Sequence, residues 1–185
     1  MFLSIREMEL RKLSFDEAFP PGEIEYLDRK LRQASDLKVS GSAELLPNTD
    51  GEIRIKGHLE VRMEADCDRC LESATFPVDV SFDLYYEPAD SVPHSEELEV
   101  GAGESELDFY EGEGLELELV LREQVLLALP MQRVCRADCK GICPVCGQNR
   151  NNVECNCRTE TADDRWAALR DLSEDRERSV VPPKS

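Results

Sequence analysis

Cysteine is concentrated in one part of this 185-residue chain, because six of its eight cysteines lie within the 23 residues from Cys135 to Cys157. The first residues turn charged too early for a secretory signal, so we expect a cytoplasmic protein with reduced thiols. Clustered cysteines in that compartment indicate metal ligands before disulfides. We favour one structural zinc ion bound by four thiolates, with an iron–sulfur cluster or disulfides as the alternatives.

The run Cys143-Pro-Val-Cys146-Gly147 suits a metal-binding turn, since proline fixes one torsion and Gly147 tolerates a positive φ. The other two ligands are harder to choose. Cysteines two positions apart in extended chain point oppositely, so we expect only one of Cys155 and Cys157 to ligate. The predicted zinc ligands are Cys139, Cys143, Cys146 and Cys157, with Cys135 and Cys155 as substitutes.

Cys67 and Cys70 form a separate Cys-x2-Cys pair. Two thiolates are half of a zinc site, so the pair either completes a second site with leftover cysteines or packs in the core. A redox dithiol is the third option, although such a pair usually begins a helix, where the thiol pKa falls.

Two alternating segments are the clearest structural signal. From Ile53 to Ala65 apolar residues occupy odd-numbered positions and charged residues occupy most even-numbered ones. A second alternation of this kind runs from Phe76 to Tyr86. Both are typical of half-buried antiparallel strands, and we expect a hairpin with Cys67 and Cys70 in its connection. Residues 36–46 predict one more strand, which ends at a Pro-Asn-Thr-Asp-Gly turn.

The segments that follow favour a loop, a short strand and a helix. Residues 88–103 are rich in Pro, Ser, Gly and Glu, and residues 106–110 predict a strand. Strong helix formers from Leu115 to Leu129, with apolar residues at four-residue spacing, predict a buried helix that Pro130 ends.

The predicted fold is therefore α+β: an antiparallel β-sheet or partly closed barrel, one packed helix and a C-terminal Cys-rich zinc-binding lobe. We expect a β-rich core domain at 1–130, the zinc lobe at 131–158, and a short helix with a flexible acidic tail at 159–185.

The net charge of −18 is unevenly distributed. From Leu71 to Leu121 there are 15 carboxylates and no lysine or arginine, so this stretch repels phosphate and serves as a solvated face or meets a basic partner. Cationic residues gather near the cysteines instead. The candidates for RNA or partner contact are Arg133, Arg136, Lys140, Arg150, Arg158 and Arg165.

No set of residues in the sequence predicts an enzyme. His58 and His94 lack a neighbouring nucleophile or carboxylate pair, and the glycines near residue 101 stand among glutamates that would repel a phosphate. The longest apolar run, Val125 to Leu129, is far too short to span a membrane. We expect no catalytic activity, no small-molecule substrate and no membrane association.

Several motifs resemble the YceD family, the large ribosomal RNA subunit accumulation proteins. They cover residues 50 to 172: Cys67-Asp-Arg-Cys-Leu71, Leu126-Leu-Ala-Leu-Pro-Met131, the block from Cys135 to Gly147, Cys155-Asn-Cys157, and Asp164-Arg-Trp-Ala-Ala-Leu169. The last departs from the Asp-Pro-Arg that the family often shows. Some members lack the cysteine block, so the resemblance implies that metal is a local clamp.

The resemblance implies a non-enzymatic ribosome biogenesis factor that supports 23S rRNA accumulation or processing and large-subunit assembly. Its partner would be the large-subunit precursor, through 23S rRNA or a basic ribosomal protein. The alternative is a metal-binding or thiol-redox protein that uses the Cys-x2-Cys pairs.

Overall fold

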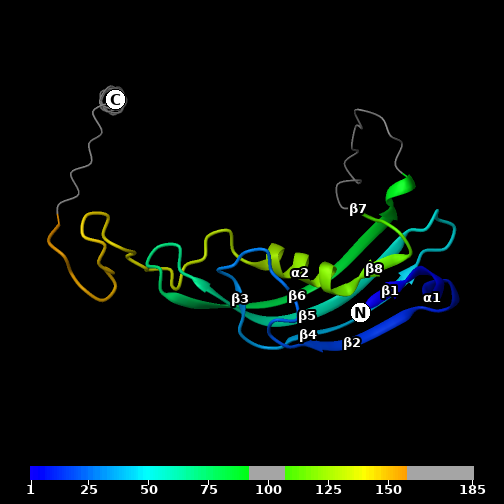
Figure 1. Ribbon diagram of the computed structural model, residues 1–185, viewed down its shortest axis with the longest axis horizontal. Helices are drawn as coiled ribbons and strands as arrows, with labels where there is room; N and C mark the ends of the chain where they lie inside the picture. Colours follow the sequence, from blue (N-terminus) through cyan, green and yellow to red (C-terminus); the bar gives the residue numbers. More distant parts are fainter. Residues whose placement is uncertain (92–106, 158–185) are drawn as a thin grey trace, which may run out of the picture. The chain divides into compact units, whose positions relative to one another are not determined.

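The computed structural model describes residues 1–91 and 107–157 (Figure 1). Its main sheet follows the strand order β2-β4-β5-β6-β7, and the short β3 pairs with β5 off this path. The strands of this sheet are β2 (Leu13–Phe19), β3 (Arg32–Gln33), β4 (Leu37–Leu45), β5 (Ile53–Asp66), β6 (Ser73–Pro88) and β7 (Leu107–Tyr110). The order has two ends, so the sheet is open rather than a closed barrel.

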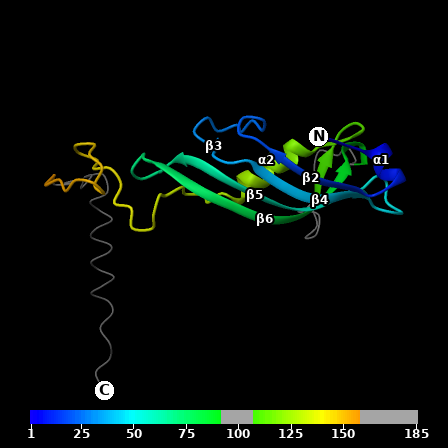
Figure 2. The same ribbon diagram turned by 90° about the horizontal axis from the view of Figure 1, so that it is seen from below.

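The β5–β6 hairpin is the longest pairing, and its two ribbons run side by side in Figures 1 and 2. Its register extends from Ile53 opposite Tyr86 to Asp66 opposite Ser73. The apolar side chains of β5 face the core, where Ile55, Leu59 and others have no exposed surface. The charged side chains between them face solvent. The alternation in the sequence therefore predicted both the strands and the buried face.

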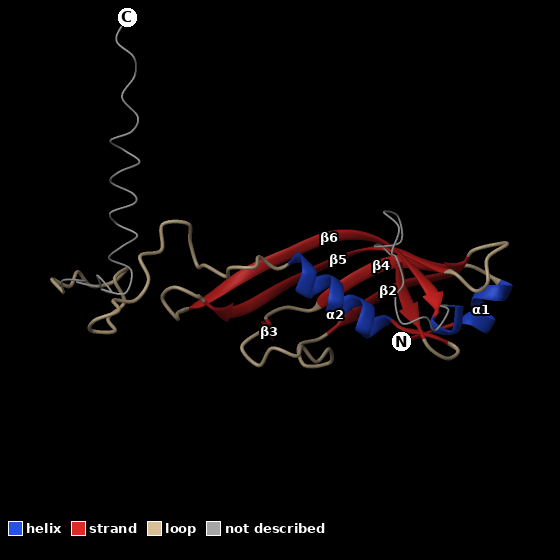
Figure 3. Cartoon of the chain, turned by 90° about the horizontal axis from the view of Figure 1, so that it is seen from above, coloured by secondary structure: helices blue, strands red, loops and turns tan. Residues whose placement is uncertain are grey.

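Helix α2 (Leu117–Ala128) lies across one face of the sheet (Figure 3). Leu117, Leu121 and Val125 are completely buried at the four-residue spacing seen in the sequence, and they join the single large core of this unit. The helix ends before Pro130, which lacks the N–H that a further turn would need. The expected packed helix is thus present.

Two glycines face each other in the middle of the sheet, Gly41 of β4 and Gly57 of β5. Phe15 is opposite Gly41 and Phe82 is opposite Gly57, so one row across four strands reads Phe-Gly-Gly-Phe. A Cβ on Gly57 would lie 2.7 Å from Cζ of Phe82, and one on Gly41 only 2.4 Å from the carbonyl oxygen of Lys56. The two rings therefore occupy the space that side chains at these positions would need.

The N-terminal elements were not expected from the sequence. β1 (Phe2–Ser4) pairs antiparallel with β8 (Gly114–Glu116) in a separate two-stranded sheet, and α1 (Ile5–Leu10) follows β1 directly. Helix α1 and strand β2 come from residues whose alternation of apolar and polar side chains is weak. Gln33, a buried polar side chain, donates from Nε2 to the carbonyl oxygens of Phe19 and Ser35 and so fixes the segment after β2.

Two further details differ from the expected antiparallel architecture. β7 runs parallel to β6, with Tyr85 opposite Leu107, and a short 3-10 turn (Ala89–Ser91) follows β6.

The compact units are Met1–Cys139 and Lys140–Ser185, so the boundary falls after residue 139 rather than after residue 130. The expected loop at 88–103 lies largely outside the described residues, and the predicted tail at 159–185 lies wholly outside them. Among the described residues, no helix is long and apolar enough to cross a membrane.

Candidate metal centres

Four cysteines of the first unit meet at the closed end of the β5–β6 hairpin. Their sulfur atoms lie within 4.8 Å of one another and belong to Cys67, Cys70, Cys135 and Cys139. We call this group the hairpin cluster. Its Sγ–Sγ distances include 3.9 Å between Cys67 and Cys139 and 3.7 Å between Cys70 and Cys135. Zinc–sulfur bonds of about 2.3 Å place the sulfurs of a tetrahedral site about 3.8 Å apart, so this donor set fits such an ion.

The connection between β5 and β6 orients the first two thiols. The N–H of Cys67 donates to the carbonyl oxygen of Glu72 at 2.8 Å, and the N–H of Leu71 donates to that of Cys67 at 2.9 Å. Leu71 adopts a positive φ of 62°, which is uncommon for a side chain of its size. The tight turn places both thiols on the same side, as a Cys-x2-Cys metal turn requires.

The other two thiols come from the segment after α2, which hydrogen bonds hold against the hairpin. The N–H of Asp68 donates to the carbonyl oxygen of Arg133 at 2.7 Å, and Oδ2 of Asp68 accepts from the N–H of Arg133 at 2.6 Å. The N–H of Cys135 donates to Sγ of Cys67 at 3.3 Å, and Arg69 donates to the carbonyl oxygen of Cys139. These bonds explain why residues 131–139 belong to the first unit.

The second unit contains the other four cysteines in one group, the knuckle cluster: Cys143, Cys146, Cys155 and Cys157. The N–H of Gly147 donates to the carbonyl oxygen of Cys143 at 2.8 Å, and Gly147 has the positive φ of 72° that glycine allows. The N–H of Cys143 donates to the carbonyl oxygen of Gln148, which closes the turn. The expected turn is present, and its sulfurs can surround one ion.

The asparagines between the two halves of the knuckle cluster build the turns that bring its halves together. Oδ1 of Asn151 accepts from the N–H of Lys140 at 2.8 Å, and Oδ1 of Asn149 accepts from the N–H of Asn151 at 2.9 Å. Ile142 and Asn149 form an isolated antiparallel bridge. Side-chain acceptors of this kind stabilise tight turns, so these residues act through structure.

Each cluster contains one thiol whose pKa is lowered and two whose pKa is raised. Burial acts to raise the pKa of Cys67, but N–H donors from Cys135, Cys70 and Arg69 lower it to about 6. The N–H groups of Cys146 and Val145 lower the pKa of Cys143 to about 6. Burial and the adjacent Cys139 sulfur raise the pKa of Cys135 to about 12. Four thiolates this close would repel one another, and a divalent metal ion held among them would supply the compensating charge.

The structure groups the predicted ligands differently. Cys143, Cys146 and Cys157 come together as predicted, and the fourth member of their group is Cys155 rather than Cys139. Cys139 lies in the hairpin cluster with Cys135. Residues 153–157 form no strand, so side-chain alternation does not separate Cys155 from Cys157. Cys67 and Cys70 belong to a second four-cysteine group. The sequence indicated this second group only through the number of cysteines, because eight are enough for two sets of four.

The cationic residues suggested for RNA or partner contact are divided between the two units and the residues that the structure does not describe. Arg133 donates to Asp28 at 2.8 Å and has a side chain only 23% exposed, so it holds the fold together. Arg136 faces Asp138 at 3.3 Å in the first unit, while Lys140 and Arg150 belong to the second. Arg158 and Arg165 lie outside the described residues.

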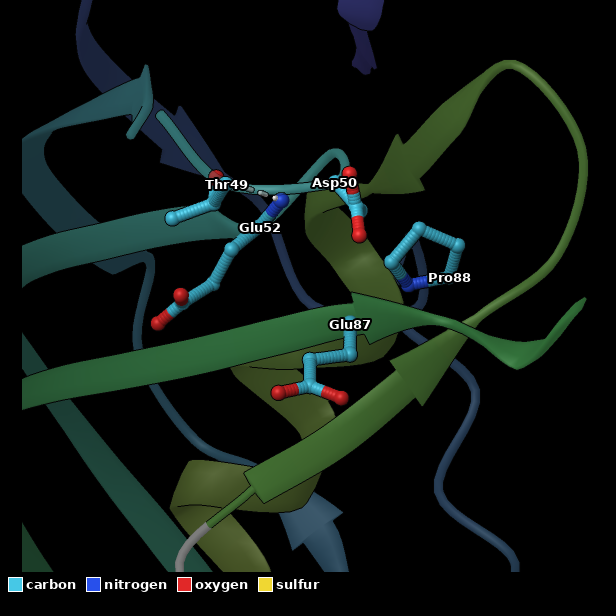
Figure 4. Close-up of a pocket in the computed structure, with 5 residues that line it drawn as sticks. All are labelled: Thr49, Asp50, Glu52, Glu87 and Pro88. Atoms are coloured by element: carbon cyan, nitrogen blue, oxygen red, sulfur yellow. Dashed lines mark hydrogen bonds between the residues drawn. The ribbon is translucent and has the colours of Figure 1, made fainter. Parts of the chain in front are cut away.

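Two groups of acidic side chains lie on the surface of the first unit. A hollow of about 330 Å³ lies where β5 begins and β6 ends, and its lining residues are Thr49, Asp50, Glu52, Glu87 and Pro88. Figure 4 shows these five side chains. The lining has three carboxylates and neither a histidine nor a cysteine. On the outer face of the sheet, Nε2 of His58 lies 3.4 Å from Glu60 and 3.5 Å from Asp79, all three well exposed. His94 lies outside the described residues.

The sequence profile of the family described as large ribosomal RNA subunit accumulation protein YceD matches residues 55–173. The uncharacterized protein YlbN of Bacillus subtilis is 22% identical over 91% of this chain and 92% of its own length. The uncharacterized proteins Rv2926c of Mycobacterium tuberculosis and Mb2951c of Mycobacterium bovis are each 33% identical over 63% of this chain. That match covers 54% of the mycobacterial proteins. No solved structure matches.

Proposed function

Because the chain belongs to the family of large ribosomal RNA subunit accumulation proteins, YceD, we propose that it is a non-enzymatic factor that supports 23S rRNA accumulation and large-subunit assembly. The observation that carries this proposal is the family match over residues 55–173, which includes all eight cysteines and both clusters. The family description supports a ribosome-associated role. The proposal extends this role to the assembly of the particle.

We propose zinc as the resident metal of the cysteine clusters. Four thiolates in a tetrahedral arrangement are the donor set of structural zinc, which has no redox chemistry and no directional preference of its own. When bound, the ion supplies charge compensation and a cross-link between chain segments. A site closed by four protein sulfurs keeps no position for a reacting water. A structural role agrees with a factor that works by binding.

The charge of the chain favours a particular kind of contact with the ribosomal precursor. The net charge of −18 opposes broad contact with phosphates, so a basic ribosomal protein is the favoured partner for the acidic surfaces. RNA contact would depend on small cationic spots such as Lys140 and Arg150, since Arg133 is engaged with Asp28. Cytoplasmic location follows from the same role.

A thiol-redox role is the competing proposal, and the lowered pKa of Cys67 is the observation in its favour. The side chain of Cys67 has no exposed surface, however, and Cys70 is 4% exposed, so an external disulfide would not reach them. Inert buried thiols are typical of structural sites. A rapid reaction of Cys67 in the metal-loaded protein would reverse this preference.

Depletion of the protein in its natural host tests the proposed function. We expect a lower ratio of 23S to 16S rRNA, accumulated 23S precursors, and migration of the tagged protein with large-subunit precursors in a sucrose gradient. The double variant Lys140→Glu/Arg150→Glu should weaken that co-migration, while Lys38→Glu/Lys56→Glu on the outer face of the sheet is the charge-matched control. Unchanged rRNA ratios and precursors after depletion would refute the assembly role.

A further inference from the structure

The two cysteine clusters differ in how their sulfurs are shielded. In the hairpin cluster Cys67, Cys70 and Cys139 are 0%, 4% and 5% exposed, and only Cys135 reaches solvent. In the knuckle cluster only Cys143 is buried, while Cys146 and Cys157 are exposed. An incoming chelator must reach a sulfur or the ion itself, so shielding slows exchange.

The two clusters also differ in what holds their ligands without metal. The turn of the hairpin cluster continues β5 and β6, whose apolar faces belong to the large core, and Asp68 fixes the segment that carries Cys135. Among the described residues of the second unit, 140–157, only Gly141 and Cys143 are buried. Its apolar side chains Ile142, Val145 and Val153 are all exposed. Residues 140–157, the described part of this unit, have no apolar core of their own to preserve their fold once the metal leaves.

We propose that Cys67, Cys70, Cys135 and Cys139 bind a second metal ion, separate from that of the knuckle cluster, and that the two ions exchange at unequal rates. The hairpin ion is retained and fastens residues 133–139 to the sheet. The knuckle ion is exchangeable, and its loss unfolds residues 140–157 alone. The proposal rests on the proposed zinc binding and deepens it, because it divides the metal into a permanent ion and a removable one.

This division has a consequence for the binding function. The described part of the second unit, which carries Lys140 and Arg150, would be ordered only while the knuckle ion is bound. The sheet and its core would persist in either state, since their stability comes from buried apolar surface. Metal availability would therefore switch one binding element on or off without unfolding the protein.

Metal release from the full-length, zinc-loaded chain tests the proposal, with the chromophoric chelator 4-(2-pyridylazo)resorcinol in large excess. We expect two zinc ions per chain, released in two phases of equal amplitude with rates at least about tenfold apart. Hydrogen exchange after the fast phase should show lost protection at residues 140–157 and retained protection at residues 67–72. One ion per chain, a single release phase, or early loss of protection at residues 67–72 would overturn the proposal.

Single-cysteine variants assign the phases. Cys146→Ser should remove the fast phase and leave the slow one, while Cys70→Ser should do the reverse. Val145→Ser, in the same turn as Cys146 but without a ligand change, is the matched control and should keep both phases. If Cys70→Ser does not fold, hydrogen exchange of the unaltered chain still decides the order. Loss of both ions in Cys146→Ser would contradict the proposed independence. None of these measurements involves ribosomes, so their failure is distinct from failure of the assembly role.

Discussion

The guanidinium of Arg133 donates a hydrogen bond to Oδ2 of Asp28 at 2.8 Å and so joins segments 105 residues apart. Its backbone N–H meanwhile donates to Asp68 in the hairpin connection. Arg133 therefore links three parts of the chain: the loop before β3, the hairpin and the segment that carries Cys135. This arrangement gives Arg133 a structural role beside the hairpin cluster.

Replacement of Arg133 by alanine should act on stability. We expect a loss of roughly 0.5–1 kcal/mol in the free energy of unfolding, since the pair is partly exposed and screened by solvent. Urea denaturation followed by circular dichroism measures it. Arg136→Ala, whose partner Asp138 is largely exposed, is the control and should stay within about 0.5 kcal/mol of the unaltered chain. Equal effects of the two substitutions would show that Arg133 has no special structural role.

The contribution of Asp28 should depend on pH. The N–H of Lys30 and the side chain of Arg133 lower the pKa of this carboxyl below its ordinary value. Because the folded pKa is depressed, the stabilisation is fully present above the unfolded pKa of about 4 and is lost as the pH falls through the folded pKa. Denaturation midpoints of the unaltered chain and Asp28→Asn should therefore differ at pH 7 and converge near pH 2. A constant difference over that interval would contradict the lowered pKa.

The Phe-Gly-Gly-Phe row should not accept a Cβ. Gly41→Ala should destabilise the chain by about 2–3 kcal/mol, because the new carbon would lie 2.4 Å from the backbone oxygen of Lys56. Gly57→Ala should cost less, since the ring of Phe82 can shift and the nearest backbone atom, the carbonyl oxygen of Ser40, would be 2.9 Å away rather than 2.4 Å. Thermal and urea denaturation compare both with Ser42→Ala on the outer face. Full stability of Gly41→Ala would mean that the strands separate there at no cost.

The two faces of α2 should respond differently to truncation. Leu121→Ala removes a completely buried side chain and should cost about 2–5 kcal/mol. Leu127→Ala removes a side chain that is 72% exposed and should change the free energy of unfolding by less than about 0.5 kcal/mol. The same denaturation assay measures both. Comparable losses would imply that an additional surface covers Leu127.

The elements that the sequence predicted are those with strong periodic patterns. The β5–β6 hairpin, β4, β7 and α2 all have patterns that one buried face explains, and the structure contains each of them. α1 was missed because only one of its six residues, Met8, is buried, which leaves almost no periodic signal. β2 was missed because Glu17 interrupts the alternation of Leu13, Phe15 and Phe19. β1 is a strand only because β8 pairs with it, and such a pairing leaves no local signal.

The sequence located the thiols that could bind metal, but it did not show which four of them lie together. Cysteine spacing located the knuckle turn at Cys143 and Cys146, since a Cys-x2-Cys turn is a local structure. The assignment of Cys139 depends on the hairpin tip, more than 60 residues earlier in the chain, and on the Asp68 bonds that hold residues 133–139 beside it. Tertiary contacts of this kind decide which cysteines share an ion.

The parallel pairing of β6 with β7 places Leu107 beside Tyr85, about 10 Å back along the strand from the end of β6. The sequence supplies fifteen residues between Ser91 and Leu107, and an extended chain of that length spans far more than this distance. Topology therefore does not dictate the length of this acidic insertion. A chain in which a Gly-Ser linker replaces these residues should keep the same sheet. Any function that such a chain loses would depend on the acidic residues themselves.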